Sequence, residues 1–493
     1  MAEEKLPNWL KNRAHLSPDR PAIEFEGHTY SFLELYTLSE KMAGRLSSIG
    51  LGAGDSCAVL LRNHIDGVVV IHALFHLGVK IVMLNNKLTA KELSWQIEDS
   101  KTAYLVSEGS FSVKLADIGE ILPDLKLHLM EELPDEGTAG ILQEFYLEDT
   151  ATIMYTSGTT GNPKGVIQTF GNHWWSAVGS VLNLGLHEED SWYCAVPIFH
   201  ISGLSILMKN VIYGMKVVLA ERFDEREANR SIQENGVTII SVVTAMLNRM
   251  VQDMKGTSYP KTFRCFLLGG GPAPVHLLVV CKEKGIPVYQ TYGMTETSSQ
   301  IVTLAPEYSM TKIGSAGKPL FPSQLRIEKD GTICEPGAVG EIVVSGPNVT
   351  KGYFNRMDAT QQAITDGWLY TGDLGYLDEE GFLYVLDRRS DLIISGGENV
   401  YPAEIENVLS THPDVFEAGV TGTEDEKWGQ VPLAFVVLHQ GAELGESELL
   451  EYCREYLASY KIPRNVIFCK ELPRNGASKL LRRELKKEMG EWQ

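Results

Sequence analysis

The stretch YTSGTTGNPKG, from Tyr155 to Gly165, directly follows the apolar, strand-like run Ala151 to Met154. Glycines let a backbone approach an anion closely and turn its N–H groups toward it, while the hydroxyl groups and the lysine add donors and positive charge. The stretch therefore predicts a phosphate-binding loop that follows a strand. Its candidate binding residues are Thr156, Ser157, Gly158, Thr159, Thr160 and Lys164.

A Walker-type P-loop is the closest alternative, but it requires Ser or Thr after the lysine, at the entrance to a helix. Here Gly165 follows Lys164, and Val166 to Thr169 is typical of a strand. No helix dipole would then help to bind the anion, so the lysine and the hydroxyl groups have to contribute more. The remaining alternative is a polar loop without a ligand.

Composition limits the classes of partner. A chain of 493 residues suggests about three folding units at about 150 residues each. The net charge of −20 argues against a nucleic-acid partner and against an anionic membrane surface. The seven cysteines include no CxxC pair and are typical of reduced thiols, and the amino terminus is too polar for a signal peptide. We expect a cytoplasmic protein without a membrane partner; the oligomeric state, including a homo-oligomer, stays open.

Strand-like and helix-like segments alternate before the loop. Pro21 to Tyr30 predicts a hairpin that turns at Glu26 and Gly27, and a capping box at Ser31 starts a helix. From Cys57 to Val106 the alternation is typical of βαβ units and predicts a parallel sheet. Residues 108 to 150 are less regular, and we expect a connecting edge there.

The alternation continues after the loop and carries two unusual polar residues. His200 and Lys209 interrupt an apolar, glycine-punctuated stretch. Their ordinary interpretations are a hydrogen-bonded core histidine and a lysine whose aliphatic stem reaches out to solvent. Further on, three glycines follow a strand directly, where open α/β sheets place ligands. These are Gly269, Gly270 and Gly271.

The segment YQTYGMTET, residues 289 to 297, combines aromatic and polar groups. Tyr292, next to Gly293, can lie against a flat ring, and Glu296 offers an oxygen ligand for Mg²⁺. A core aromatic residue and a solvated carboxylate explain these residues equally well.

The texture changes beyond Ile313, where short strands and turns predict a small β-barrel or sheet, with Asp373 in a Gly-Asp turn. The last hundred residues read β-β-α-β-α, with Pro402 opening a helix. We therefore expect an α/β protein with two domains. Residues 1–390 form a large N-terminal domain of α/β sheets plus the small β-barrel, and residues 391–493 form a smaller α+β C-terminal domain.

Six motifs occur once each and in a fixed order between residues 150 and 480: TSGTTGNPKG, FHISG, YGMTE, YTGD, DRRSDLIISGGENVYPAEIE and PRNGASK. Together they closely resemble the acyl-adenylate-forming superfamily of acyl-CoA synthetases, adenylation domains and firefly-type luciferases. The resemblance implies two half-reactions. A carboxylate attacks the α-phosphate of MgATP to give an acyl-adenylate and pyrophosphate, and the thiol of coenzyme A then displaces AMP.

Finer texture in FGNHWWSAVGSVLNLG, FHISGLS, LLGGGPAP and YGMTETSSQIVTL resembles the bacterial o-succinylbenzoate-CoA ligases of menaquinone biosynthesis. A medium-chain or aryl acyl-CoA synthetase is the nearest alternative. A luciferase is the same fold with an added oxidation step, which nothing in the sequence demands. An adenylation domain that loads a carrier protein is disfavoured, because the sequence contains no carrier module. A nucleotide-binding protein without catalysis is disfavoured by Lys479 and Glu296.

The resemblance implies roles for the nucleotide-binding residues. Lys164 and the hydroxyl groups of Thr156 to Thr160 would bind the β and γ phosphates, and Thr295 and Glu296 would serve the α-phosphate and the magnesium ion, with Thr156 as a second metal ligand. The adenine would lie between Tyr292, Gly293 and the Gly269–Gly271 turn. The ribose hydroxyls would be bound by Asp373, with Arg388 near the same sugar.

The resemblance also implies the catalytic and acyl-binding residues. Lys479, in PRNGASK, would bridge the attacking carboxylate and the α-phosphate, although by itself it reads as a surface lysine in a basic stretch that includes Arg482. His200 and Ser202 would wall the acyl pocket. Lys209 would pair with the aryl carboxylate that o-succinylbenzoate keeps after activation.

A mobile C-terminal domain follows from the same resemblance, because Lys479 has to leave before coenzyme A enters. Family members usually carry Gly-Arg, one further residue, and Asp or Lys at the hinge, whereas this chain has Asp387 and Arg388, with Ser390 at the hinge position. After rotation, Gly396 and Gly397 would line the tunnel for coenzyme A.

Overall fold

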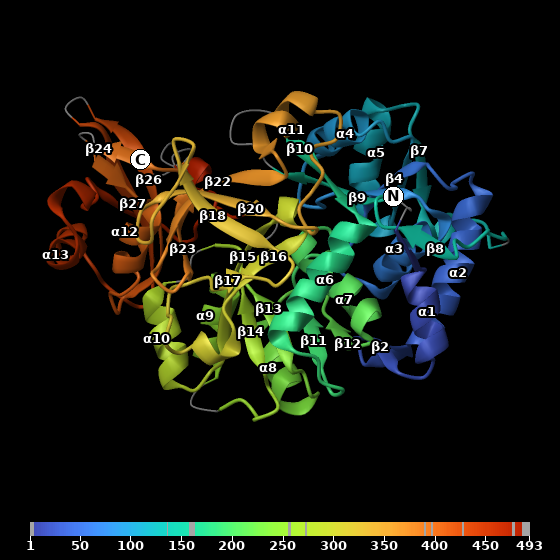
Figure 1. Ribbon diagram of the computed structural model, residues 1–493, viewed down its shortest axis with the longest axis horizontal. Helices are drawn as coiled ribbons and strands as arrows, with labels where there is room; N and C mark the ends of the chain where they lie inside the picture. Colours follow the sequence, from blue (N-terminus) through green and yellow to red (C-terminus); the bar gives the residue numbers. More distant parts are fainter. Residues whose placement is uncertain are drawn as a thin grey trace.

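The computed structural model describes residues 4–135, 137–156, 163–254, 258–271, 274–388, 391–395, 398–425, 428–475 and 479–485. Two large sheets with flanking helices form the bulk of the molecule, and an antiparallel sheet links them to a smaller unit at the left of Figure 1. The observed architecture agrees with the expected α/β class.

The first large sheet has the strand order β10-β9-β5-β4-β6-β7. All its pairs are parallel except the pair of β9 with β10, which is antiparallel. The parallel βαβ prediction is therefore confirmed. The strands are β4 (Ser56–Leu60), β5 (Lys80–Met83), β6 (Tyr104–Ser107), β7 (Lys126–Leu129), β9 (Thr150–Thr156) and β10 (Lys164–Thr169), and the helices are α2 (Phe32–Ser48), α3 (Ile65–Leu77), α4 (Ala90–Asp99) and α5 (Ser112–Ile121), with the 3₁₀ turns η1 (Gly109–Phe111) and η2 (Met130–Glu132).

Sequence patterns placed most of these elements correctly. The predicted capping box at Ser31 begins α2, and a second capping box, at Thr89, begins α4. The expectation of a mere connecting edge over residues 108–150 is too coarse, because that segment contains helix α5 and strand β7, which extends the sheet beside β6. Helix α5 buries only Leu115 and Ile118, so its apolar periodicity is short.

The second large sheet has the order β17-β16-β15-β14-β13-β11-β12-β2-β3. Its central pairs are parallel, and an antiparallel hairpin forms the β2–β3 edge with Glu26 and Gly27 at positive φ, as predicted. The strands are β2 (Pro21–Phe25), β3 (His28–Ser31), β11 (Ser191–Cys194), β12 (Lys216–Leu219), β13 (Ile239–Val242), β14 (Cys265–Leu268), β15 (Val288–Met294), β16 (Ser299–Thr303) and β17 (Lys318–Pro319). The associated helices are α6 (Phe170–Leu184), α7 (Ile201–Tyr213), α8 (Glu225–Glu234), α9 (Thr244–Asp253) and α10 (Val275–Glu283), with η3 (Thr295–Thr297) and η4 (Pro306–Tyr308); α1 (Trp9–Leu16) and the pair β1 (Lys5–Pro7) and β8 (Glu144–Tyr146) complete this part.

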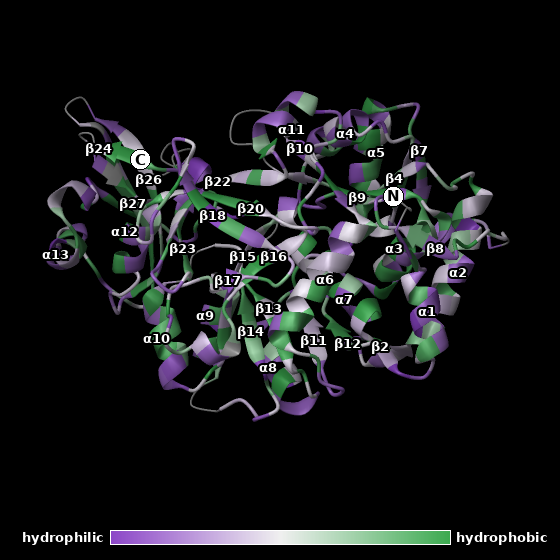
Figure 2. Ribbon diagram, in the orientation of Figure 1, coloured by the Kyte–Doolittle hydropathy of each residue, from purple (hydrophilic) through white to green (hydrophobic). Residues whose placement is uncertain are grey.

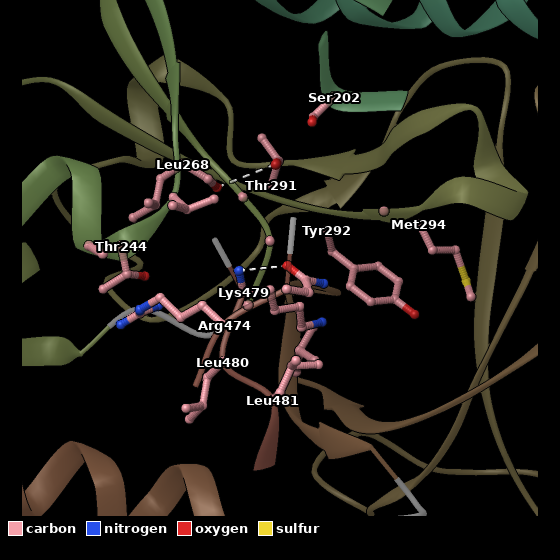
Figure 3. Close-up of a pocket in the computed structure, with 18 of the residues that line it drawn as sticks. Ser202, Thr244, Leu268, Thr291, Tyr292, Met294, Arg474, Lys479, Leu480 and Leu481 are labelled. Atoms are coloured by element: carbon pink, nitrogen blue, oxygen red, sulfur yellow. Dashed lines mark hydrogen bonds between the residues drawn. The ribbon is translucent and has the colours of Figure 1, made fainter. Parts of the chain in front are cut away.

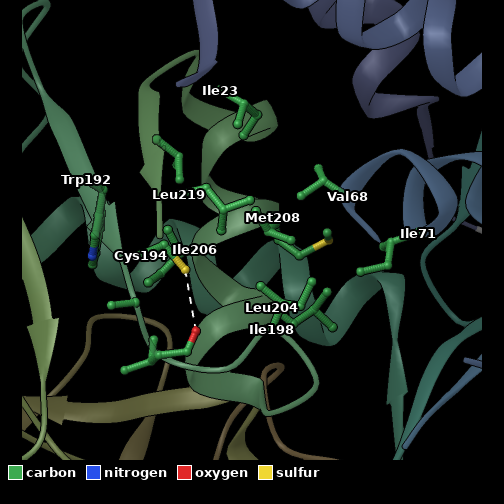
Figure 4. Close-up of a cluster of buried hydrophobic side chains, with 14 of the residues drawn as sticks. Ile23, Val68, Ile71, Trp192, Cys194, Ile198, Leu204, Ile206, Met208 and Leu219 are labelled. Atoms are coloured by element: carbon green, nitrogen blue, oxygen red, sulfur yellow. Dashed lines mark hydrogen bonds between the residues drawn. The ribbon is translucent and has the colours of Figure 1, made fainter. Parts of the chain in front are cut away.

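One apolar core joins the two large sheets (Figure 4). Met208 and Leu204 of α7 lie near Val68 and Ile71 of α3, with Trp192 of β11 on the other side. All five of these side chains are almost completely buried. Helix α7, which begins directly after His200 and contains Lys209, is thus fixed on several sides. Figure 2 shows that strands β13 and β14, which support the same region, are strongly apolar.

The third sheet is antiparallel, corresponds to the small β-barrel or sheet expected beyond Ile313, and is called the half-barrel here. It contains β18 (Gln324–Lys329), β19 (Thr332–Ile333), β20 (Gly340–Ser345), β21 (Ile364–Thr365), β22 (Trp368–Leu377) and β23 (Leu383–Arg388), with helix α11 (Met357–Ala363). The predicted turn at Asp373 is wrong, because Asp373 lies inside β22. The register of β22 on β20 shifts there, and Gly372 has φ +74°. A glycine that permits positive φ serves a β-bulge as well as a turn.

The fourth sheet has the order β25-β24-β27-β26, with β28 beside β27. Its elements are β24 (Ile393–Ser395), β25 (Glu398–Val400), α12 (Pro402–Leu409), β26 (Val415–Asp425), β27 (Gly429–Leu438), α13 (Glu446–Tyr456), η5 (Ser459–Lys461), β28 (Val466–Phe468) and α14 (Arg482–Leu485). The predicted order β-β-α-β-α omitted β26, α13 and β28. A core composed only of residues from Ile393 onward packs this unit. None of the helices in the described ranges has the length and apolar character that a membrane span requires.

Candidate active site

A cavity of about 2290 Å³ runs between the large sheets, the half-barrel and the C-terminal unit. It brings together residues that lie more than 300 positions apart in the sequence. The predicted site residues that line it are Thr156, Lys164, His200, Ser202, Lys209, Gly269, Gly270, Gly271, Tyr292, Gly293, Thr295, Glu296, Asp373 and Lys479. Ser157, Gly158, Thr159, Thr160, Ser390, Gly396 and Gly397 lie outside the described residues. Arg388 is the last residue of β23, and its backbone lies opposite Asp373 of β22.

The two ends of the phosphate-loop motif face each other across an antiparallel pair. Thr156 ends β9 opposite Lys164, which begins β10, so the strand predicted after the lysine is present. The Lys164 ammonium group lies 5.0 Å from the centroid of the Tyr353 ring. Lysine and threonine are thus fixed at one end of the cavity by strand pairing, without a helix N-terminus.

Glu296 lies beside this end, on η3, and is 5% exposed. The Tyr353 hydroxyl donates to Glu296 Oε1 over 3.0 Å. Gln168, on β10, donates through its Nε2 to the Thr295 carbonyl over 2.9 Å. The η3 turn and β10 therefore form one framework, which places a carboxylate near Lys164.

Tyr353 was missed by sequence reasoning. It falls in KGYFN, a segment that offers no glycine-rich loop, charge cluster or metal-ligand spacing. Only its position between Glu296 and Lys164 marks it, and that position depends on tertiary structure.

The wall expected for the nucleoside is formed by β15, β22 and the turn after β14. The Tyr292 hydroxyl donates to Asp373 Oδ2 over 2.8 Å, and both residues are buried. Gly270 has φ +89°, which a residue with a side chain rarely adopts. A Cβ on Gly293 would lie 2.1 Å from the Ser299 carbonyl oxygen, so glycine is required where β15 meets β16. The two residues assigned to adenine and ribose are therefore joined by a hydrogen bond.

His200 is the residue immediately before α7 and lies at the N-cap position. Burial, with a smaller effect from the positive charge of Lys87, lowers the pKa of His200 to about 4. Its imidazole is therefore neutral at neutral pH. The buried Nε2 atom has no hydrogen-bond partner among the residues that the structure describes, which differs from the satisfied core histidine of the ordinary interpretation. Ser202 follows in the first turn of α7 and also lines the cavity.

Lys209, two turns farther along α7, is 1% exposed, so its stem does not reach solvent and that interpretation is wrong. Its Nζ lies 3.4 Å from Gln300 Oε1 and 5.0 Å from the centroid of the Trp192 ring. Burial lowers the pKa of Lys209 to about 7. An ammonium group held by an amide oxygen and an aromatic ring, in a cavity wall, is suited to a ligand that carries its own negative charge.

Lys479 enters the cavity from the C-terminal unit (Figure 3). Its backbone N–H donates to Asn475 Oδ1 over 2.9 Å, and its carbonyl accepts from the Asn475 N–H at the same distance. An isolated bridge between Arg474 and Leu480 closes the loop, and Arg474 pairs with Glu417. Lys479 itself is exposed, its main chain is held by Asn475, and Figure 3 shows it close to Tyr292.

An ion cluster connects the end of the half-barrel to the C-terminal unit. Arg482 contacts Glu406 Oε2 and Asp387 Oδ1, each at 2.6 Å, and Asp391 Oδ2 at 3.3 Å. Burial opposes the charge, but the carboxylates, Glu406 foremost, outweigh it and raise the pKa of Arg482. Arg482 was grouped with a basic surface stretch, whereas its side chain is only 15% exposed.

Comparison with known proteins supports an interpretation of this geometry. The sequence profile of the AMP-binding enzyme family matches residues 10–354, and that of the AMP-binding enzyme C-terminal domain matches residues 404–479. A 2-succinylbenzoate–CoA ligase of Geobacillus kaustophilus is 59% identical over 482 residues, which cover 98% of both chains.

The solved structures of the o-succinylbenzoate CoA synthetase of Bacillus subtilis are also similar. Its complexes with the acyl-adenylate intermediate OSB-AMP and with ATP and magnesium ion are 53% identical, with TM-scores of 0.92 and 0.91, and cover 98% of this chain and 98% and 100% of theirs. A double mutant of that enzyme bound with the product analogue OSB-NCoA, at the same identity and 98% coverage of both chains, has a TM-score of 0.77.

Proposed function

The chain belongs to the AMP-binding enzyme family, and from this premise we propose that it is an acid–thiol ligase that activates o-succinylbenzoate with ATP and transfers the acyl group to coenzyme A. The reaction yields AMP and pyrophosphate. The observation that carries the proposal is the single cavity lined by Lys164, Glu296, Asp373, Lys209 and Lys479. It offers sites for phosphates, a ribose, a second carboxylate and a developing negative charge.

In the first half-reaction the acid attacks the α-phosphate of ATP. Lys164 would bind the β and γ phosphates that leave, and Asp373 would accept hydrogen bonds from the ribose hydroxyls. Lys479 would bridge the attacking carboxylate and the α-phosphate, where negative charge accumulates in the transition state. A cation placed there stabilises the transition state more than the ground state, as catalysis requires.

The donors present fit a magnesium ion that is shared with the nucleotide. Within the described residues no three acidic, histidine or cysteine side chains gather into a metal cage, and Glu296 is a buried carboxylate at the phosphate end. Mg²⁺ commonly takes one or two carboxylates and completes its shell with phosphate oxygens and water. Glu296, with Thr156 nearby in the cavity wall, would hold the ion, which supplies neutralising charge to the phosphates.

The acid itself would lie against α7. Neutral His200 would wall the pocket beside the reacting carboxylate without adding charge to it. Lys209 would bind the aryl carboxylate beside Gln300 and Trp192, which already contact its ammonium group. An unbranched fatty acid would leave this ammonium group buried without a counter-ion, which disfavours the medium-chain alternative.

In the second half-reaction the thiol of coenzyme A has to reach the carbonyl carbon of the acyl-adenylate, next to which Lys479 would lie. The arrangement of the two parts resembles the adenylate and ATP complexes of the Bacillus subtilis enzyme more than its product-analogue complex, because the TM-score falls from 0.92 to 0.77 at equal identity. We infer that the structure represents the adenylate-forming arrangement. Residues 391–493 would then rotate about Ser390, and Gly396 and Gly397 would turn toward the entering thiol.

A cytoplasmic location fits this chemistry. All seven cysteines lie within the described residues and are free thiols, and both ATP and coenzyme A are intracellular co-substrates.

A pyrophosphate-release assay with a panel of acids tests the proposal. We expect o-succinylbenzoate to be activated with the highest kcat/KM, followed by 4-oxo-4-phenylbutanoate, which lacks only the aryl carboxylate, and then by benzoate and octanoate. Formation of the coenzyme A thioester should follow the same order. Preference for octanoate would favour the medium-chain synthetase, and failure of every acid to release pyrophosphate would overturn the proposed reaction.

A further inference from the structure

A short segment, Thr350–Phe354, runs beside β10 and is called the strap here. The Ile167 N–H donates to the Gly352 carbonyl over 3.1 Å, and the Phe354 N–H donates to the Gly165 carbonyl over 2.7 Å. The strap thus pairs with the strand that begins at the phosphate-loop lysine, although some 190 residues separate the two in sequence.

The strap also reaches the turn that carries the acidic site residue. The Thr350 N–H donates to the Glu296 carbonyl over 2.7 Å, and the Thr350 hydroxyl donates to the Ile167 carbonyl over 2.5 Å. One segment therefore fixes the backbone of both β10 and η3. Its own shape is held by Gly352, since a Cβ there would lie 2.4 Å from Thr360 and the backbone has φ +142°.

Tyr353 is the residue of the strap that faces the cavity. Its hydroxyl donates to Glu296 Oε1 over 3.0 Å, and its ring centroid lies 5.0 Å from Lys164 Nζ. One side chain therefore contacts both the candidate metal ligand and the candidate phosphate ligand. Because a carboxylate oxygen accepts hydrogen bonds, the tyrosine hydroxyl is the donor in this contact.

A packing aromatic residue would explain the ring but not the hydroxyl contact. Buried hydroxyl groups commonly satisfy themselves on backbone carbonyls or water, whereas this hydroxyl is committed to a buried carboxylate. A metal ligand needs a fixed direction, which partners outside the coordination shell normally provide. A carboxylate offers about four lone-pair positions, so the tyrosine can hold one and leave others for a cation.

We propose that Tyr353 is a positioning residue for nucleotide binding: its hydroxyl orients the Glu296 carboxylate toward Mg²⁺, and its ring supports the Lys164 ammonium group over the phosphates. The inference rests on the proposed function, because it presumes that MgATP occupies this end of the cavity. It separates two contributions of one side chain, and two substitutions can therefore test them apart.

The test measures ATP binding by isothermal titration calorimetry, without acid or coenzyme A, over a range of Mg²⁺ concentrations. Tyr353→Phe keeps the ring and removes the hydroxyl, and we expect the Mg²⁺ concentration for half-maximal ATP affinity to rise about tenfold, the scale of one hydrogen bond to a charged group. At saturating Mg²⁺ its ATP affinity should stay within about threefold of the unmodified protein. Tyr353→Leu removes the ring as well, and its ATP affinity should fall about tenfold even at saturating Mg²⁺.

Tyr36→Phe is the matched control, because Tyr36 also donates to a glutamate, Glu40, over 2.8 Å, but on an exposed face outside the cavity. It should leave the Mg²⁺ dependence unchanged. A Tyr353→Phe protein that melts at the normal temperature and shows the normal Mg²⁺ dependence would overturn the inference. If the unmodified protein binds no MgATP at any Mg²⁺ concentration, the proposed function fails, and this inference fails with it.

Discussion

Two lysines line the same cavity in opposite settings. Lys209 is 1% exposed on a helix that is packed on several sides, and its pKa is lowered to about 7 by burial. Lys479 is exposed on a loop of the C-terminal unit, where a backbone bridge and Asn475 hold its main chain. A fixed, desolvated cation suits recognition of a ligand charge, whereas a cation on a separable unit suits a step that has to be followed by its withdrawal.

The comparison also explains why neither lysine was understood from sequence pattern alone. Lys209 fits a snorkelling side chain, and Lys479 fits a basic terminal stretch. The first interpretation fails because α7 is buried on the side that carries Lys209. The second fails because the C-terminal unit places its loop over the cavity.

The largest expected effect belongs to Lys479→Ala. Loss of one charge that acts mainly in the transition state should lower the rate of acyl-adenylate formation about 100- to 1000-fold. Pyrophosphate exchange into ATP measures this step. Lys470→Ala, an exposed lysine of the same unit outside the cavity, is the control and should retain normal exchange. A normal rate of pyrophosphate exchange in Lys479→Ala would contradict the catalytic role of Lys479.

Lys209→Met tests the recognition half. The substitution keeps an unbranched side chain and removes the charge, so the KM for o-succinylbenzoate should rise about 10- to 100-fold, the scale of a buried charged hydrogen bond. The KM for 4-oxo-4-phenylbutanoate should change little, because that acid has no carboxylate at the aryl end. If the KM values for the two acids rise equally, Lys209 supports the shape of the pocket but does not bind the second carboxylate.

Ser390→Pro tests whether the C-terminal unit, which carries Lys479, rotates between the two half-reactions. Proline fixes φ near −65° and should restrict rotation at this position. We expect thioester formation to slow about tenfold or more, with pyrophosphate exchange nearly unaffected, and single-turnover assays of each half-reaction separate the two. Equal slowing of both would place the hinge elsewhere.

The smallest expected effect is on stability. The folded-state pKa of Lys209 lies near 7, below the ordinary 10.5, so the folded state binds fewer protons between these values. Stability of the ligand-free protein should therefore fall as the pH drops from about 10 to about 7. Lys209→Met removes this dependence and should raise the melting temperature at pH 7, with a smaller gain at pH 9. A lower melting temperature at pH 7 would show that the charge is well accommodated.

Local sequence signals account for much of the fold. Capping boxes, the Glu26–Gly27 hairpin turn and the βαβ rhythm rest on short-range rules, and the structure confirms them. Helix α5 was not predicted from the sequence, because only two of its residues are buried and its apolar pattern is correspondingly short. The bulge at Asp373 was not predicted, because a Gly-Asp pair occurs both in β-bulges and in turns. The domain boundary at Ser390 stays a prediction, supported by a separate core beyond Ile393.

The site divides along the same line. The motifs that resemble a known family correctly predicted several residues of one cavity, namely Gly269 to Gly271, Gly293, Lys164, Glu296 and Lys479. Tyr353 and Arg482 contact partners from distant elements, Glu296 for the first and Asp387 and Glu406 for the second. No local pattern encodes such pairings, since they arise only when the strap and the C-terminal helix are packed in place.

Thioester formation by Lys479→Ala from supplied o-succinylbenzoyl-adenylate tests the central claim most directly. If Lys479 acts only before its unit withdraws, single-turnover transfer to coenzyme A should proceed within about threefold of the unmodified rate, although adenylate formation by the same variant has fallen about 100- to 1000-fold. Equal loss in both half-reactions would contradict the division of work between a fixed lysine that recognises the acid and a withdrawn lysine that activates it.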